Sequence, residues 1–351
     1  MPRHGGPSGK GGIMSYRGVL IGCGFFARNH MAAWRDIPGV EIVAVCDRDP
    51  AKAEAYARDF GIPCWGVEAE VLLAEVAPDF VDIATTVGSH RALVELAARH
   101  ARLVICQKPF AETMEDARAM VAACAATGAM LAVHENFRWQ RPIREVKALL
   151  EAGAVGVPRW LRLSFRHGYD IYANQPYLAE VRDLALTDIG LHLFDMVRHL
   201  MGDVERLSCE VQRRNPRVAG YDAFKALLRH GSGAVSSVEC SFHSALSPDP
   251  FPQSLIVVEG DAGTIEVTEG YRLRLHRGGA VEERGVEPPC PAWGERPWHL
   301  IQDSVLEFQR QAVAALDGRG TVEPSGAHNL GTLAMVLAAI RAADEGAVVR
   351  L

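Results

Sequence analysis

The sequence predicts an α/β protein in two parts: a Rossmann fold with a parallel sheet, then an α+β domain with an open-faced, mostly antiparallel sheet. Three observations support this prediction. Strands and helices alternate through the first third of the chain, and a glycine-rich turn follows the first strand. After about residue 134, strands become more frequent and are separated by glycine turns. The 351 residues exceed one compact Rossmann unit and suit two domains.

In the first part, short apolar runs are predicted as strands at 19–21, 41–46, 80–84, 102–106 and 130–133. Helical patterns lie between them, one ending near 34 and the others at 50–60, 89–100 and 112–127. Strands separated by helices of this length imply βαβ units and a parallel sheet. Strands that are apolar throughout fit a sheet that is covered on both faces.

In the second part, strands are predicted at 159–166, 205–213, 223–229, 233–243, 254–259, 263–268 and 271–277. Helices are predicted at 142–152, 187–201, 299–317 and 327–344. The segment 159–166 alternates in polarity, and glycines at 231–233, 260–263 and 270 mark hairpin turns. This pattern indicates a mostly antiparallel sheet with one helical face.

Composition excludes several classes of function. The net charge of −6 gives no basic surface for nucleic acid or an anionic membrane, and no apolar run approaches the length of a bilayer span. The Gly-rich residues 1–14 lack the apolar region of a secretory signal, so we interpret them as a disordered or artificial extension of the folded chain. Eight scattered cysteines without a CxxC pair indicate a reducing cytoplasm and no structural metal site.

The segment GCGFFA (22–27) fits the pattern G-x-G-x-x-G/A between a strand and a helix. Gly22 allows the tight turn, Gly24 lets the backbone approach a pyrophosphate, and the helix N-terminus offers N–H groups to phosphates. A glycine turn without a ligand is the alternative. It is disfavoured because Asp47 ends the second strand about twenty residues later, where an acid binds a ribose 2′-hydroxyl.

Asp47 predicts NAD as the cofactor and makes NADP less favourable, since a carboxylate repels a 2′-phosphate. Arg48 leaves the choice open. It could pair with that phosphate, lie over the adenine, or be a solvated charge in a turn.

Two further segments carry candidate catalytic groups. Lys108 follows the strand 102–106 at its carboxyl end, the edge where open α/β sheets bind ligands; a surface lysine is the alternative. Asp188 and His192 are four residues apart in a predicted helix, so a carboxylate could orient an imidazole for proton transfer. A contact on the helix surface is the alternative for this pair. Asp195 and His199 continue the same face, but no H-E-x-x-H spacing predicts a metal site.

From about Tyr16 onward, the chain resembles the Gfo/Idh/MocA family of sugar and polyol dehydrogenases. The matching segments, in the family's order, are GCGFFA, TTVGSH (85–90), CQKPF (106–110), VHENFRW (133–139), TDIGLH (187–192) and EGDAGTIEV (259–267). The resemblance implies that His192 takes the hydroxyl proton, that Lys108 bonds the reacting oxygen and that Asp188 assists. It also implies assembly into a homodimer or homotetramer through the second sheet.

The expected domains are a Rossmann domain at 15–133, a substrate and oligomerisation domain at 134–325, and a C-terminal helix at 326–351 that packs back on the Rossmann domain. The expected cofactor residues are Gly22, Gly24, Phe25, Phe26, Asp47, Arg48, Thr85, His90, Gln107, Lys108 and Asn136. The expected substrate residues are Lys108, Arg138, Arg166, Tyr169, Asp188 and His192, with Trp139 and Trp298 as further candidates.

One position departs from the family pattern. The residue before Lys108 is Gln107, where the family usually has Glu. An amide still hydrogen-bonds a cofactor, but it brings no charge to favour the protonated lysine.

The predicted function is NAD-dependent oxidation of a sugar or polyol, at C1 if the substrate is an aldose. CQKPF and HENFRW further resemble the apiose dehydrogenases of the family, which makes apiose one expected substrate. Two alternatives stay open: a catalytically silent nucleotide sensor, and a glycosidase that borrows and returns hydride.

Overall fold

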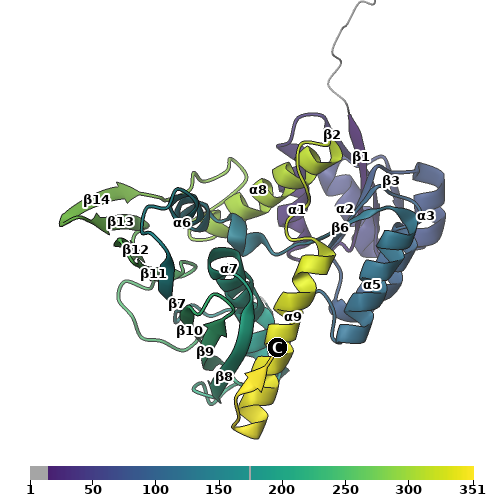
Figure 1. Ribbon diagram of the computed structural model, residues 1–351. Helices are drawn as coiled ribbons and strands as arrows, with labels where there is room; N and C mark the ends of the chain where they lie inside the picture. The colour runs from purple at the N-terminus through teal and green to yellow at the C-terminus, as the bar shows by residue number, and fades with distance from the viewer. Residues whose placement is uncertain (1–14, 174) are drawn as a thin grey trace, which may run out of the picture.

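The computed structural model describes residues 15–173 and 175–351, so the extension predicted at 1–14 lies outside the described residues. Two sheets lie side by side, and the last long helix, yellow in Figure 1, runs between them. The first sheet is parallel and the second is mostly antiparallel, which confirms the predicted fold class.

The parallel sheet has six strands in the order β3-β2-β1-β4-β5-β6. Their bounds are β1 Tyr16–Ile21, β2 Val40–Cys46, β3 Cys64–Gly66, β4 Phe80–Ile83, β5 Leu103–Cys106 and β6 Met130–Val133. Alternate residues enter two different cores: Leu20 and Phe80 face one side of the sheet, whereas Val19 and Val81 face the other. Both faces are therefore covered, which explains why these strands are apolar throughout.

The helices of this half are α1 Ala27–Arg35, α2 Pro50–Phe60, α3 Ala69–Val76, α4 His90–Ala97 and α5 Met114–Thr127, with a 3₁₀ turn η1 at Val87–Ser89. Their ends follow local chemistry. The Asp49 side chain accepts from two N–H groups at the start of α2, and Gly61 ends that helix at φ 67°. Strand β3, which has only three residues, and helix α3 were not predicted.

The second sheet has nine strands in the order β14-β13-β12-β11-β7-β10-β9-β8-β15, and its strands pair antiparallel except for β7 and β10. Their bounds are β7 Pro158–Arg166, β8 Val204–Gln212, β9 Ala223–His230, β10 Val235–Ser241, β11 Leu255–Gly260, β12 Gly263–Thr268, β13 Arg272–Arg277, β14 Ala280–Gly285 and β15 Val349–Arg350. Strand β9 alternates buried and exposed residues over most of its length, so one face of the sheet builds the core. The strands β14 and β15 were not predicted.

Helix α7 (Leu191–Met201) and the short turn η4 (Ala185–Gly190) pack on this sheet. Helix α6 (Arg141–Glu151) and the short turn η2 (Asn136–Trp139) pack against α7, and a further turn, η3, spans Pro176–Glu180. The turn η4 is π-helical, whereas an α-helix was predicted to begin at 187.

Two long helices join the halves. Helix α8 (His299–Leu316) packs against α1, and Phe308 enters the core on one side of the parallel sheet. Helix α9 (Gly326–Glu345) contacts α5 and β6 of the first half and also α7 and β8 of the second. Strand β15 then pairs with β8, so the chain end belongs to the second sheet. None of the helices in the described part of the chain combines the length and apolarity needed to cross a membrane.

Candidate active site

The glycine-rich turn lies between β1 and α1. A Cβ atom on Gly22, which has φ +102°, would lie 2.5 Å from the Ala84 carbonyl oxygen, so this position requires glycine. A Cβ on Gly24 would meet nothing within 4 Å. Helix α1 begins without a side-chain cap among the described residues. The N–H groups of Arg28 and Asn29 donate to the backbone oxygens of Phe25 and Phe26, so the N–H groups before Arg28 are the ones that can meet a ligand. The turn therefore has the shape and the donors that a pyrophosphate needs.

Asp47 directly follows β2 and lies against this turn. Its Oδ2 accepts from the backbone N–H of Cys23 at 2.8 Å, and its Oδ1 accepts from the N–H of Asp49 at 3.0 Å. The carboxylate is therefore held where a ribose hydroxyl can donate to it. Arg48 is exposed beside it. These features fit a dinucleotide cofactor.

A cavity of about 640 Å³ opens at the carboxyl edge of the parallel sheet, toward the second sheet. Among the residues predicted for the site, its lining includes Phe25, Phe26, Thr85, Gln107, Lys108, Asn136, Asp188, His192 and Trp298. The structure thus brings the three predicted catalytic side chains together with most of the predicted cofactor residues.

Lys108 and Asp188 form an ion pair at the cavity wall. The lysine Nζ lies 2.7 Å from Asp188 Oδ1 and donates also to the Asp188 backbone oxygen at 3.2 Å. Both side chains are only partly exposed. Asp188 therefore holds the lysine, which corrects the prediction that it orients His192.

The partner of His192 is Glu135. The imidazole Nδ1 lies 2.5 Å from Glu135 Oε2, and both side chains are 2% exposed. The ring also stacks on Phe137 at 4.0 Å between centroids. The predicted pairing with Asp188 fails because Asp188 belongs to a π-helical turn, where residues four apart do not align as in an α-helix.

Burial controls the charge of this second pair. It lowers the pKa of His192 well below its usual range, and the Lys108 ammonium lowers it further. Burial also raises the pKa of Glu135 well above its usual range. The lowered pKa of His192 favours the neutral imidazole, so a ring nitrogen with a free lone pair exists at neutral pH.

Two of the other residues that were predicted to bind the cofactor, Gln107 and Asn136, line the cavity with polar atoms. The Oε1 atom of Gln107 is buried without a hydrogen-bond partner in the described structure, and the Asn136 amide donates to Ser304 Oγ at 2.7 Å. An unpaired buried oxygen is costly unless a ligand donates to it. By contrast, the His90 ring is fully buried against the backbone oxygens of Thr85 and Phe110 and does not line this cavity.

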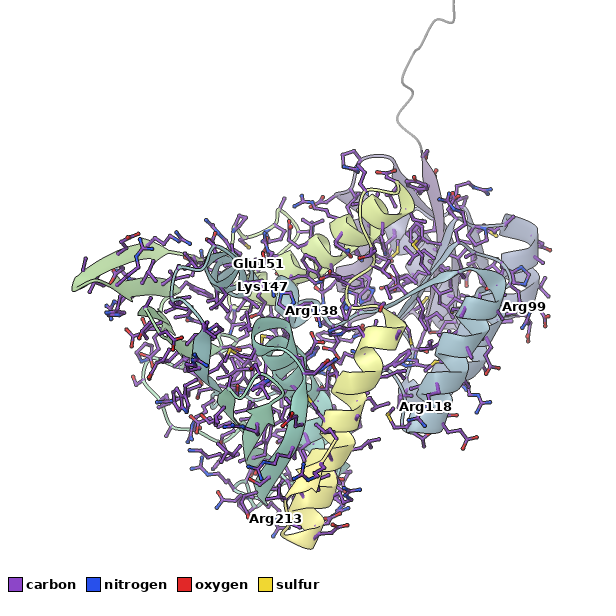
Figure 2. All side chains as sticks on the ribbon, in the orientation of Figure 1. Arg99, Arg118, Arg138, Lys147, Glu151 and Arg213 are labelled. Carbon is purple, nitrogen blue, oxygen red and sulfur yellow. The ribbon has the colours of Figure 1, made fainter. Side chains whose placement is uncertain are left out.

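The arginines predicted to bind substrate lie elsewhere. Arg138, labelled in Figure 2, is buried and forms a bidentate ion pair with Asp195 at 2.7 and 2.6 Å. Arg166 is on the sheet face opposite Phe165, which lines the cavity, because strand residues alternate between faces. Neither arginine is among the described residues that line the cavity.

The aromatic residues that were predicted as substrate contacts differ in whether they line the cavity. Tyr169 stacks on Phe251 at 4.2 Å, behind the cavity wall that Phe251 and Trp298 form. The Trp139 indole donates to the Glu323 backbone oxygen at 3.1 Å and packs against the core of the parallel sheet. Trp298 is thus the aromatic candidate that the structure places on the cavity.

Several polar residues on the cavity were not predicted, and Glu135 and His167 are two of them. Glu135 lies two positions after the end of β6, so the carboxyl-edge rule that selected Lys108 could have found it. His167 follows β7 two residues after Phe165, and alternation places both toward the cavity. The His167 ring is 1% exposed, and neither ring nitrogen has a hydrogen-bond partner among the described residues.

A glycine turn, a strand-end carboxylate and a lysine–histidine cluster around one cavity define a dinucleotide-dependent oxidoreductase of the Rossmann class. The chain belongs to the Gfo/Idh/MocA oxidoreductase family. The family model for the NAD-binding Rossmann fold matches residues 16–135, and the model for the GFO/IDH/MocA C-terminal domain matches residues 143–266.

Similar proteins cover nearly the whole chain. A D-apiose dehydrogenase of Rhizobium rhizogenes is 47% identical over 95% of this chain and 96% of its own. Another, from Paraburkholderia graminis, is 47% identical over 97% of this chain and 90% of its own. An Agrobacterium radiobacter oxidoreductase, solved with NAD⁺, L-tartaric acid and magnesium, is 46% identical over 96% of this chain and 98% of its own, with a TM-score of 0.94.

Proposed function

We propose that this protein is an NAD-dependent dehydrogenase that oxidises a hydroxyl of a sugar, with D-apiose, at C1, as the first candidate. The observation that carries the proposal is the convergence of Lys108, Asp188 and His192 on one cavity beside the glycine turn. The similarity to two D-apiose dehydrogenases supports the choice of sugar.

Each side chain has a distinct task in this reaction. NAD⁺ accepts a hydride from the carbinol carbon, which becomes a carbonyl while its hydroxyl proton passes to the protein. His192 takes that proton at Nε2, since Nδ1 faces Glu135. Lys108 donates a hydrogen bond to the reacting oxygen, and Asp188 fixes the ammonium in place.

The test is NADH absorbance with purified protein on D-apiose, other aldoses and polyols. We expect D-apiose to give the highest kcat/KM. The variant His192→Asn should lower kcat by about 10²–10⁴-fold. Cofactor binding without turnover on any sugar would favour a nucleotide sensor, and glycoside cleavage without net NADH would favour a glycosidase; either result contradicts the proposal.

We further propose that the protein is a homodimer or homotetramer joined through the outward face of the nine-stranded sheet. Leu227 on β9 is 54% exposed on that face, beside Lys225 and Glu239, which lie 3.5 Å apart. Sedimentation velocity should give an oligomer that Leu227→Glu weakens, and a wild-type monomer would contradict the assembly. We place the protein in the reducing cytoplasm, because each of its eight cysteines is a free thiol.

A further inference from the structure

Glu135 and His192 contact each other, and both line the cavity. Glu135 follows β6, and His192 is in the first turn of α7, 57 positions later in the chain. The Phe137 ring lies parallel to the imidazole, at an interplanar angle of 4°. The 2.5 Å contact and this stacking leave the imidazole one orientation, with Nδ1 on the carboxylate.

The other charged groups around this pair are already balanced. Lys108, from the loop after β5, is paired with Asp188 of η4. Arg138 of η2 is paired with Asp195 of α7. His134, at the end of β6, is buried, and its pKa lies well below its usual range because of that burial, so it is neutral. Glu135 is therefore the carboxylate left to balance a proton that arrives on His192.

On the basis of the proposed function, we infer that Glu135 is a positioning residue for the base His192. Glu135 fixes the imidazole with Nε2 toward the substrate, and it takes up the Nδ1 proton during oxidation. When the substrate hydroxyl proton moves to Nε2, the Nδ1 proton moves to Glu135 Oε2. One O–H bond breaks in the substrate and one forms in Glu135. The imidazole ends neutral, with its hydrogen on Nε2.

The physical reason for this relay is the cost of buried charge. An imidazolium at this depth loses its hydration, and the Lys108 ammonium opposes it. Moving the second proton to a carboxylate that is itself desolvated leaves both groups neutral. Asp188 cannot serve in this way, because its carboxylate is engaged by Lys108.

The activity test uses two variants of this one side chain. Glu135→Gln keeps the shape and can still accept from Nδ1, but it cannot take a proton. We expect kcat to fall about 10²-fold and the acidic limb of the pH–rate profile to move to lower pH, because Nε2 loses a negative neighbour. Glu135→Asp keeps the carboxylate, so it should recover part of kcat and an acidic limb close to that of the wild type.

Glu151→Gln on the exposed surface of α6, labelled in Figure 2, is the matched control and should behave as the wild type. NAD affinity should be unchanged in all three variants. A Glu135→Gln enzyme with normal kcat and an unmoved acidic limb would overturn the inference. So would a Glu135→Asp enzyme no better than Glu135→Gln.

A second measurement does not depend on turnover. In the NAD-bound protein, proton NMR should show a strongly downfield Nδ1–H resonance that disappears in Glu135→Gln and in His192→Asn. If that resonance is present and no sugar is oxidised, the proposed function fails while the pairing stands. If sugar is oxidised and the resonance is absent or insensitive to Glu135→Gln, the proposed function stands and this inference fails.

Discussion

Lys108 and Asp188 form an ion pair with 2.7 Å between Nζ and Oδ1, and Nζ also donates to the Asp188 backbone oxygen. The pair joins the loop after β5, at the carboxyl edge of the parallel sheet, to the π-helical turn before α7. An ammonium with two fixed acceptors keeps a constant direction, so its remaining N–H can be aimed into the cavity.

The first prediction concerns this ammonium. Lys108→Met keeps most of the stem but removes the donor to the reacting oxygen, so kcat should fall by about 10²-fold or more with NAD affinity little changed. Asp188→Asn should cause a smaller loss, because Lys108 stays present but less firmly held. Stopped-flow NADH formation measures both. Lys147→Met on α6 is the control, and near-normal turnover of Lys108→Met would show that the lysine is structural.

The second prediction concerns cofactor choice. The wild-type enzyme should prefer NAD to NADP, since the fixed Asp47 carboxylate would face the 2′-phosphate. Asp47→Ala should lower kcat/KM for NAD by about 10-fold or more, because a charged hydrogen bond to the ribose is lost. The same variant should reduce the ratio of kcat/KM for NAD to that for NADP. Steady-state kinetics with both cofactors checks this, with the exposed Glu54→Ala as control. An NADP preference in the wild type would contradict the role of Asp47 and favour Arg48.

The third prediction concerns His167. Burial lowers the pKa of this imidazole to about 4, so it is neutral at working pH and offers one donor and one acceptor to a sugar hydroxyl. His167→Phe keeps a ring among its aromatic neighbours and should raise the sugar KM by about 10-fold, the value of one hydrogen bond. The increase in the sugar KM should be the same between pH 6 and 9, because His167 does not titrate in that range. Tyr169→Phe, behind the cavity wall, is the control; an unchanged KM in His167→Phe would contradict the contact.

The fourth prediction is a loss of stability at Arg138. Its buried pair with Asp195 becomes an uncompensated carboxylate in Arg138→Met, which should cost about 3–5 kcal/mol. The double variant Arg138→Met with Asp195→Leu should recover most of that loss. Thermal unfolding measures all of these. Arg118→Met, exposed on α5 in Figure 2, is the control, and a Tm equal to that of the wild type in Arg138→Met would disprove the argument.

The fifth prediction is a pH effect at Asp303 on α8. Burial raises the pKa of its carboxyl to about 6, although Arg144 lies 3.6 Å away and lowers it in part. Because this pKa is higher in the folded protein than in the unfolded chain, the carboxyl costs stability as pH rises from about 4 to about 6. Asp303→Asn should therefore stabilise the protein at pH 7 by about 1–3 kcal/mol and change little at pH 4. Unfolding at both pH values checks this, with Glu151→Gln as control, and equal effects at the two pH values would contradict it.

Local patterns predicted much of the fold and part of the site. The strands of both sheets were located by apolar runs and by alternation, and the elements that were missed are short or peripheral: β3, α3, β14 and β15. In the site, Gly22 and Asp47 were predicted because a dinucleotide turn has a fixed spacing along the chain. Arg166 was misplaced although the sequence held the needed signal, since alternation puts 165 and 167 on the cavity side and 166 on the other.

The sequence by itself determined what depends on neighbours along the chain: the parallel sheet, its glycine turn, and the lysine at the carboxyl end of β5. Only the tertiary structure decided which charges meet. Spacing favoured Asp188 with His192, but a π-helical turn displaces Asp188 toward Lys108, and β6 brings Glu135 to the imidazole from 57 positions away. The tertiary structure likewise buries Arg138 against Asp195, which is also 57 positions away. The physical reason is that a buried charge must find a partner in space, and packing, not spacing along the chain, decides which partner is within reach.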